Sequence, residues 1–256
     1  MAERTGERTR ILEYPFEYFD VQIQFAKKWT HITGEDLSKV LLEKTALYRR
    51  IIGKKAGEAL DVNWVPVCQN ITAEPDRASA IIYNYYSRLP ESRYTVHPHE
   101  FNSFEFDYYP GRSTVKVHYN PTIRGERSNL GREFLQDRVA DLKRMFEHIH
   151  QMHPDAARVI GGSWLYNLDA YKRIFPPTYT QNMVQLVPPQ LSLTGNSVWG
   201  QFVDSQGAGK RDICQKFLLK VEEAITTEDL VNAFPYPTWQ PTDDIQNFYT
   251  HLGIES

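Results

Sequence analysis

The sequence feature that most constrains the fold is a pair of alternating segments joined by Pro110-Gly111. In each segment every second residue is aromatic or β-branched, and mostly polar residues stand between them: Phe104, Phe106 and Tyr108 before the turn, and Val115, Val117 and Tyr119 after it. Alternation with a period of two puts the apolar side chains on one face of a strand. The two segments therefore predict a β-hairpin over about residues 104–120, because a proline–glycine pair is typical of a tight turn.

A long amphipathic helix is predicted to follow this hairpin, over about residues 130–152. Its apolar residues fall at offsets of three and four, which makes one continuous stripe: Leu135, Val139, Leu142, Phe146 and Ile149. A short β-branched run at 157–160 follows, so the two segments resemble one α/β unit.

The same patterns predict the other elements. Helices are expected over residues 16–30, 35–52, 75–89, 168–175, 212–225, 227–234 and 243–252, and extended segments over 64–67, 183–187 and 197–204. We therefore predict an α+β protein with a mixed, largely antiparallel sheet flanked by helices. The expected domains are a helical N-terminal region at residues 1–90 and an α/β domain at 91–256.

Composition excludes several classes of function. The chain has 256 residues, a formal net charge of −3, and no run that approaches the roughly 18 apolar residues of a membrane span. A weakly negative chain has no general attraction for nucleic acid. The N-terminal segment has no apolar core of a secretory signal, and the two cysteines, Cys68 and Cys214, have no metal-type spacing. We therefore expect a cytoplasmic protein that acts on a small molecule.

A first candidate site follows the predicted strand at 157–160. Gly161-Gly162 interrupts the extended segment, and Ser163, Trp164, Tyr166 and Asn167 come directly after it. Polar groups at the carboxyl end of a strand are where α/β sheets usually bind ligands. A serine hydrolase is not indicated, because Leu165 replaces the second glycine of the GxSxG turn. Ser163 is expected to donate a hydrogen bond or to cap a helix, and Trp164 to form either a ligand wall or part of the core.

A second candidate site lies on the hairpin. His118 is expected to face Glu105 or Asp107, because alternate residues share one face of the sheet. A carboxylate would orient the imidazole as a general base, and the alternative is a solvated ion pair between neighbouring strands. His97 and His99 would, together with His118, supply ligands for zinc or non-haem iron, although no HExxH spacing supports such a centre.

A third candidate is the glycine-containing loop at 205–210, between a predicted strand and a predicted helix. The amides of Gly207 and Gly209, with Lys210, would bind a phosphate at the helix start. The loop is not a Walker motif, because Arg211 follows Lys210 where serine or threonine belongs. An ordinary connection is the alternative. Arg124, in a polar arginine-containing segment, is a candidate to receive an anionic substrate.

Three segments carry a resemblance to a known family: VKVHYNP at 115–121, GGSWLYNLDAYKRIFP at 161–176 and WGQFVDSQGAG at 199–209. Over roughly residues 100–250 the chain resembles a family of uncharacterised bacterial proteins, and more distantly the GNAT-like C-terminal domain of certain acyltransferases that carry a helical N-terminal domain. The resemblance implies a mixed sheet flanked by helices. It also implies transfer of an acyl group from acyl-CoA or a carrier thioester to an amine or hydroxyl.

The resemblance also implies roles for the candidate residues. His118 would be the base, oriented by Glu105, and Ser163 would hydrogen-bond the reacting group. Trp164 and Tyr166 would wall the site, and Gly207, Gly209 and Lys210 would hold the phosphates of coenzyme A. No tightly bound cofactor or metal is expected, and an acyl carrier protein is a possible partner. Asp204 stands where the GNAT phosphate loop has arginine or glutamine, which favours the alternative of a non-catalytic binding protein on the same fold.

Overall fold

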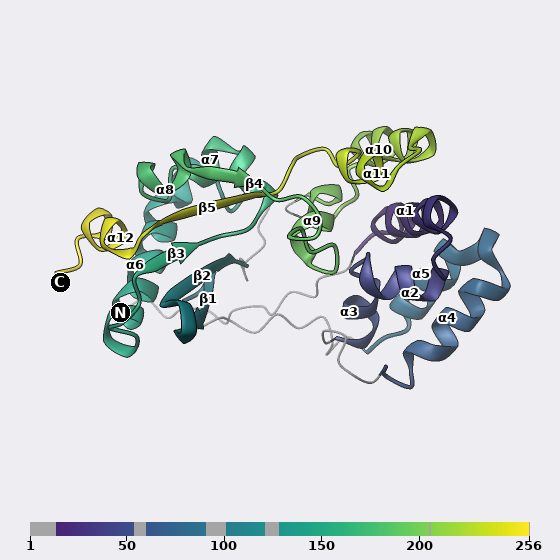
Figure 1. The fold of residues 1–256 in the computed structure, drawn as a ribbon, viewed down its shortest axis with the longest axis horizontal. Coiled ribbons are helices and arrows are strands. Elements are labelled where there is room, and N and C mark those ends of the chain that lie inside the picture. Colours follow the sequence, from purple (N-terminus) through teal and green to yellow (C-terminus); the bar gives the residue numbers. More distant parts are fainter. Residues whose placement is uncertain (1–13, 54–59, 91–100, 121–127, 205, 256) are drawn as a thin grey trace, which may run out of the picture. The chain divides into compact units, whose positions relative to one another are not determined.

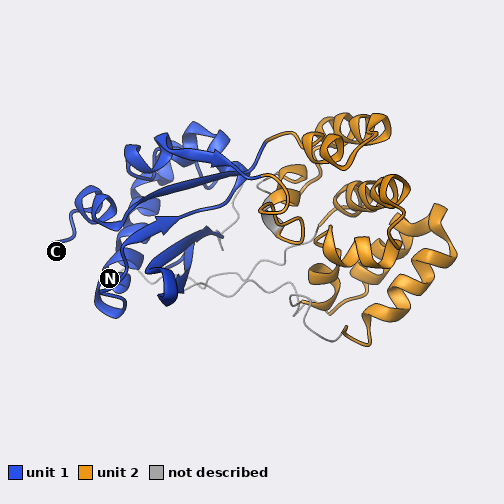
Figure 2. Ribbon diagram, in the orientation of Figure 1, with its two compact units in different colours: residues 1–10, 96–186, 237–256 blue, residues 11–95, 187–236 orange. Residues whose placement is uncertain are grey.

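The chain folds into two compact units, each assembled from segments that are separated in the sequence (Figure 2). The computed structural model describes residues 14–53, 60–90, 101–120, 128–204 and 206–255. We call the unit formed by segments 96–186 and 237–256 the sheet unit, and the unit formed by segments 11–95 and 187–236 the helical unit.

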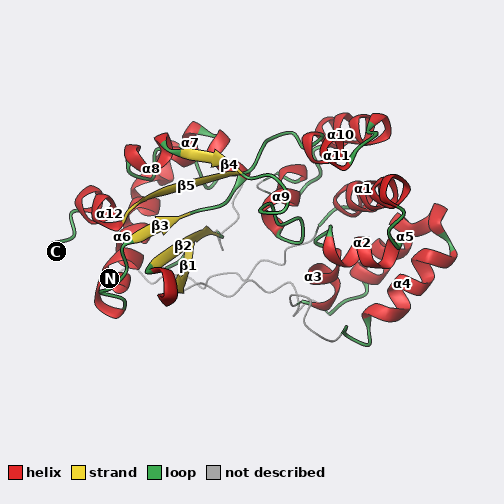
Figure 3. Cartoon of the chain, viewed as in Figure 1, coloured by secondary structure: helices red, strands yellow, loops and turns green. Residues whose placement is uncertain are grey.

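The described strands gather in the sheet unit, where they form one five-stranded sheet (Figures 1 and 3). The strands are β1 (Phe104–Tyr109), β2 (Thr114–Tyr119), β3 (Arg158–Ile160), β4 (Met183–Gln185) and β5 (Trp239–Asp244), in the spatial order β1-β2-β3-β5-β4. The β2–β3 pair is parallel, and the other three pairs are antiparallel. The prediction of an α+β protein with a mixed, largely antiparallel sheet is confirmed.

The hairpin predicted from alternation is present. β1 and β2 pair in antiparallel register from Phe104 opposite Tyr119 to Tyr109 opposite Thr114. The turn between them is a short 3-10 segment, Pro110–Arg112. Ser113 closes the turn with a φ of 44°, in the left-handed region. The apolar face of the hairpin carries Phe104, Val115 and Val117, which are buried.

Helices cover this apolar face. They are α6 (Leu135–Met152), α7 (Asp169–Lys172), α8 (Pro177–Gln181) and α12 (Ile245–Leu252), with 3-10 turns at Arg132–Phe134 and Trp164–Asn167. α6 returns the chain from β2 to the parallel strand β3, a connection that parallel pairing requires. Its predicted stripe points inward: Phe146 is fully buried and stacks on Phe248 of α12 at a ring distance of 4.6 Å.

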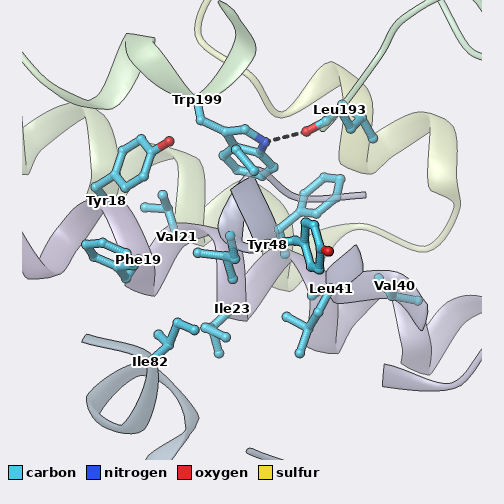
Figure 4. Packing of buried hydrophobic residues seen from close by; sticks show 14 of the residues in the cluster. Tyr18, Phe19, Val21, Ile23, Val40, Leu41, Tyr48, Ile82, Leu193 and Trp199 are labelled. Carbon is cyan, nitrogen blue, oxygen red and sulfur yellow. Dashed lines mark hydrogen bonds between the residues drawn. The ribbon is translucent and has the colours of Figure 1, made fainter. Parts of the chain in front are cut away.

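The helical unit has its own hydrophobic core. Its helices are α1 (Phe16–Thr33), α2 (Leu37–Glu43), α3 (Leu47–Ile52), α4 (Trp64–Ala73), α5 (Ala78–Ser87), α9 (Asn196–Trp199), α10 (Arg211–Glu223) and α11 (Thr227–Asn232), with 3-10 turns at Pro75–Arg77 and Gly200–Phe202. Trp199 is fully buried in this core and donates from Nε1 to the carbonyl oxygen of Leu193 at 2.7 Å (Figure 4). Its ring packs edge-on against Phe25 of α1 at 5.3 Å.

The structure divides the chain differently from the predicted division at residue 90. Segment 187–236 belongs to the helical unit and not to the sheet unit. The strand predicted at 197–204 is wrong, because this segment forms α9 and the following 3-10 turn. Its buried aromatic residues, Trp199 and Phe202, pack against Phe217 of α10 instead of alternating across a sheet.

Two further predictions differ from the structure. The extended segment predicted at 64–67 is the first turn of α4, where Pro66 is tolerated because first-turn amides have no partner within the helix. The single helix predicted at 35–52 is divided into α2 and α3, and Thr45 between them bonds the carbonyl oxygen of Leu41 through its hydroxyl. No helix among the described residues has the length and apolar character needed to cross a membrane.

Candidate functional site: the opening between two parallel strands

The parallel strands β2 and β3 diverge after three paired residues. Their register runs only from Thr114 opposite Arg158 to Lys116 opposite Ile160. β2 then stays with β1 as far as Tyr119. The chain after β3 stays with β5 instead, since Ser163 and Trp239 exchange two main-chain hydrogen bonds of 3.1 Å. The sheet therefore opens at the carboxyl ends of its two parallel strands.

The end of β2 directs main-chain groups toward this opening. Asn120 donates from its amide to the carbonyl oxygen of Ser103, so these two residues are a hydrogen-bonded pair of the hairpin. In an antiparallel ladder such pairs alternate with pairs whose amide and carbonyl groups point away from the partner strand. The N–H and C=O of Tyr119 therefore point away from β1, toward the side from which β3 has departed.

A cluster of buried tyrosines lies on the helix-covered side of the opening. Tyr166, Tyr171 and Tyr179 are almost fully buried, and the hydroxyl oxygens of Tyr166 and Tyr179 are 3.1 Å apart. The ring of Tyr119 packs on that of Tyr171 at 5.3 Å. Gly161 lies against the cluster, because a Cβ atom there would overlap the hydroxyls of Tyr166 and Tyr179.

Burial keeps these phenols protonated. It raises the pKa of Tyr119 to about 12 and the pKa values of Tyr166, Tyr171 and Tyr179 well above their usual value. At neutral pH they are hydrogen-bond donors and cannot act as bases.

A buried charged network joins β1, β2 and α6 beside the opening. Arg138 of α6 donates to the hydroxyl of Ser103 and, at 2.8 Å, to Asp141. Asp141 also accepts hydrogen bonds from Arg144 at 2.6 Å and from Asn102 at 2.9 Å. Because Ser103 also bonds the amide of the residue after β2, this network attaches the first half of α6 to the end of that strand.

Three buried donors in the described part of the sheet unit have no hydrogen-bond partner: the hydroxyl of Tyr119, Nε of Arg138 and Nε of Arg173. Arg173 donates from its terminal nitrogen to the carbonyl oxygen of Leu130, in the segment that leads into α6. Buried polar groups in proteins are nearly always hydrogen-bonded. Donors without a partner near the end of β2 therefore indicate a place for an acceptor oxygen.

His118 lies on the other face of the hairpin from Tyr119. Its Nε2 is 2.8 Å from a carboxylate oxygen of Asp107, and the two side chains are 37% and 54% exposed. Glu105 stands directly opposite His118 in the register. Of the two predicted partners, Asp107, diagonally across the hairpin, is the carboxylate bonded to the imidazole, which corrects the orienting role expected of Glu105.

The residues predicted to form a site around Ser163 make hydrogen bonds within the fold. The Ser163 hydroxyl accepts from the amide of Leu165 at 3.1 Å, so Ser163 caps the 3-10 turn, which was the alternative expectation. Asn167 donates to the carbonyl oxygens of Trp164 and Pro237 and accepts from Nε1 of Trp239 at 2.8 Å. The bonds to Pro237 and Trp239 connect the segment after β3 to the start of β5. Tyr166 is a core residue, and Trp164 is half-buried.

The predicted phosphate loop lies in the helical unit, and several of its amides are occupied by groups of the chain itself. One carboxylate oxygen of Asp204 accepts from the amides of Gln206 and Ala208, at 2.8 and 2.9 Å, and the amide of Gly207 bonds the Asp204 carbonyl at 3.2 Å. Lys210 donates to the carbonyl oxygen of Gln201, and burial lowers its pKa. The phosphate-binding role of Gly207, Gly209 and Lys210 stays a prediction, which these bonds disfavour, because an internal carboxylate takes the position of an anion at two amides of the loop.

Three predicted site residues, Arg124, His97 and His99, lie outside the described residues. Among the residues that are described, no group of three histidine, cysteine, aspartate or glutamate side chains could hold a metal ion.

Sequence reasoning missed Tyr119, Arg138 and Asp141 as site residues. Two of them are charged and yet buried, on a helix whose outer positions are otherwise solvated. An arginine and an aspartate three residues apart in a helix were the available signal. Comparison with known proteins found no matching family model, no matching curated protein and no matching solved structure.

Proposed function

We propose that this protein transfers an acyl group from a thioester of coenzyme A, or of an acyl carrier protein, to an amine or hydroxyl of a small molecule, on a GNAT-like fold. The observation that carries the proposal is the divergence of β2 and β3 after Lys116 and Ile160, beside the helix that connects them. The order of elements also follows the resemblance: a strand with His118, a long helix, and the Ser163 segment.

The opening suits the pantetheine arm that coenzyme A and carrier proteins share. This arm is narrow and extended and contains two amide groups, so it can pair with a strand end as an added strand does. The N–H and C=O of Tyr119 supply such pairing. The unpartnered donors of Tyr119 and Arg138 give carbonyl oxygens of the donor a second set of hydrogen bonds.

Neighbouring positions on β2 would supply the acid–base chemistry. His118 and Tyr119 project from opposite faces of the strand. His118, oriented by Asp107, accepts a proton from the acceptor amine or hydroxyl as its nitrogen or oxygen attacks the thioester carbonyl. The new C–N or C–O bond forms, the C–S bond breaks, and the leaving thiolate takes up a proton from solvent. The neutral Tyr119 hydroxyl, on the opposite face, would instead hydrogen-bond a carbonyl oxygen of the pantetheine arm.

The proposal is tested first by binding. Thermal unfolding is followed with increasing coenzyme A, acetyl-CoA and decanoyl-CoA. A ligand that binds only the native protein stabilises it by about 2.7 kcal/mol at a hundredfold excess over its dissociation constant. We expect a saturable rise in melting temperature with at least one of them. Release of thiol from the acyl-CoA in the presence of a panel of primary amines then measures turnover.

Tyr119→Phe is the informative variant, because it removes only the unpartnered hydroxyl. We expect it to fold with unchanged or higher stability, since no intramolecular hydrogen bond is lost, and to bind coenzyme A more weakly. Tyr85→Phe is the matched control, because its hydroxyl bonds Asn70 in the helical unit. No shift with any of the three ligands at millimolar concentration would refute coenzyme A as the donor and would leave a carrier-bound donor or a non-catalytic binding role. Binding without turnover would instead favour the non-catalytic alternative.

A further inference from the structure

The helical unit contains a pocket with a volume of about 710 Å³, between α2 and one face of α4. α4 contributes two adjacent rows of side chains at helical spacing, and α2 contributes the opposite wall. The lining residues are Asp36, Ser38, Lys39, Leu42, Leu60, Trp64, Val65, Cys68, Gln69, Thr72 and Ala73. Pockets of this size with mainly apolar walls are typical of small-molecule sites.

The inner part of the pocket is apolar. Trp64 is 1% exposed and Cys68 is 7% exposed, while Leu42 is half-buried. Burial raises the pKa of the Cys68 thiol to about 11, so this side chain is uncharged at neutral pH. At the entrance Leu60 and Val65 are 48% and 42% exposed. Exposed apolar side chains around an apolar cavity indicate a ligand with an apolar body.

The two charged side chains of the lining, Asp36 and Lys39, already have partners within the chain. Asp36 caps α2 by accepting from the amide of Lys39 at 3.1 Å. The ammonium of Lys39 lies 3.1 Å from a carboxylate oxygen of Glu35. The described structure gives the side chains of Gln69 and Thr72 no hydrogen bond. The groups available to a ligand are thus an amide and a hydroxyl, both neutral.

We propose that the pocket between α2 and α4 binds a neutral, mainly apolar small molecule that carries one amide or hydroxyl group. The apolar body lies against Leu42 and Trp64, and the polar group bonds Gln69 or Thr72. The inference does not rest on the proposed acyl transfer, because it uses no residue of the sheet unit.

The fluorescent probe N-phenyl-1-naphthylamine tests the site, because the probe is neutral and apolar and its emission rises in apolar surroundings. We expect saturable binding to the full-length protein and displacement by decanamide. Decanoate has the same chain with a charged head and should displace the probe at least roughly tenfold less well, since an unpaired charge is costly to desolvate.

Ala73→Trp fills the pocket from an exposed position at the end of α4, and Val62→Trp is the matched control, 80% exposed and outside the lining. We expect probe affinity to fall at least tenfold in the first variant and to stay within twofold in the second. In Gln69→Ala, decanamide affinity should fall roughly fivefold, the equivalent of one neutral hydrogen bond. Circular dichroism verifies that each variant is folded.

Three results would overturn the inference. They are the absence of saturable probe binding, equal affinity in Ala73→Trp and Val62→Trp, and displacement by decanoate as effective as displacement by decanamide. A failure of coenzyme A binding has no bearing on these measurements, and a failure here leaves the proposed acyl transfer untouched.

Discussion

Replacing Asp141 by alanine tests whether the buried charged network holds α6 to the end of β2. The Asp141 side chain is 5% exposed and accepts hydrogen bonds from Arg138, Arg144 and Asn102. Its removal leaves the guanidinium of Arg138, itself 10% exposed, without its counter-charge. Removing one partner of a buried ion pair lowers the free energy of unfolding by about 3–5 kcal/mol, mostly because the remaining charge stays desolvated.

Hydrogen exchange measured by mass spectrometry reads this effect separately in each unit. Amides of α6 should exchange roughly a hundred to several thousand times faster in Asp141→Ala, since exchange of core amides follows the free energy of opening. Peptides from α1, in the helical unit, provide an internal reference within the same sample. Because the chain forms two compact units, a single melting temperature does not report the stability of the sheet unit alone, whereas exchange of α6 amides does.

Two further variants separate charge burial from loss of packing. Arg144→Ala removes a partner that is 52% exposed, so we expect a loss of no more than about 1 kcal/mol. The double variant Arg138→Met/Asp141→Leu removes both buried charges and should recover most of the stability lost in Asp141→Ala. If Asp141→Ala exchanges no faster than Arg144→Ala, the reasoning about an uncompensated buried arginine is wrong.

Two more predictions concern the tyrosine cluster and a helix cap. Gly161→Ala should destabilise the sheet unit by about 1–3 kcal/mol through overpacking against two buried hydroxyls, and adding Tyr166→Phe should restore part of this loss in a urea titration; an unchanged transition midpoint would contradict the crowding. Hydrogen bonds from Thr226 lower the pKa of Asp229, so its stabilising effect on α11 is present above the unfolded value, about 3.9, and is lost as pH falls through the folded value. The protection factors of α11 amides, which are corrected for the pH dependence of intrinsic exchange, should therefore fall at acid pH in the wild type and depend less on pH in Asp229→Asn. Equal pH dependence of the protection factors in the two proteins would exclude this cap.

Local patterns were enough to predict most elements of the fold. The alternation around Pro110-Gly111 predicted the hairpin, and the apolar stripe predicted α6 to within a few residues. Both signals are local, because the side chains that share a face lie two, three or four residues apart in the sequence. The pairing of His118 with Asp107 could be predicted for the same reason, because the position of the turn sets the register of the hairpin.

Patterns failed where the environment came from distant parts of the chain. Pro66 favoured an extended segment but occupies the first turn of α4. β5 was not predicted, because Pro241 and the acidic residues after it argue against a strand. No local sequence pattern shows that segment 187–236 belongs to the helical unit. Its place there depends on the burial of Trp199 beside Phe25, which is far away in the sequence.

The sequence by itself determined most of the helical and extended segments, the turn at Pro110-Gly111, and which residues are able to act as acids or bases. Only the tertiary structure decided that β2 and β3 pair for three residues and then diverge, and that the amides of Gln206 and Ala208 donate to the Asp204 carboxylate. The physical reason is that strand pairing and burial are set by contacts between residues far apart in the chain. Arg138 and Asp141 look like a solvated helical pair in the sequence and become a buried network only because β1 and β2 pack over them.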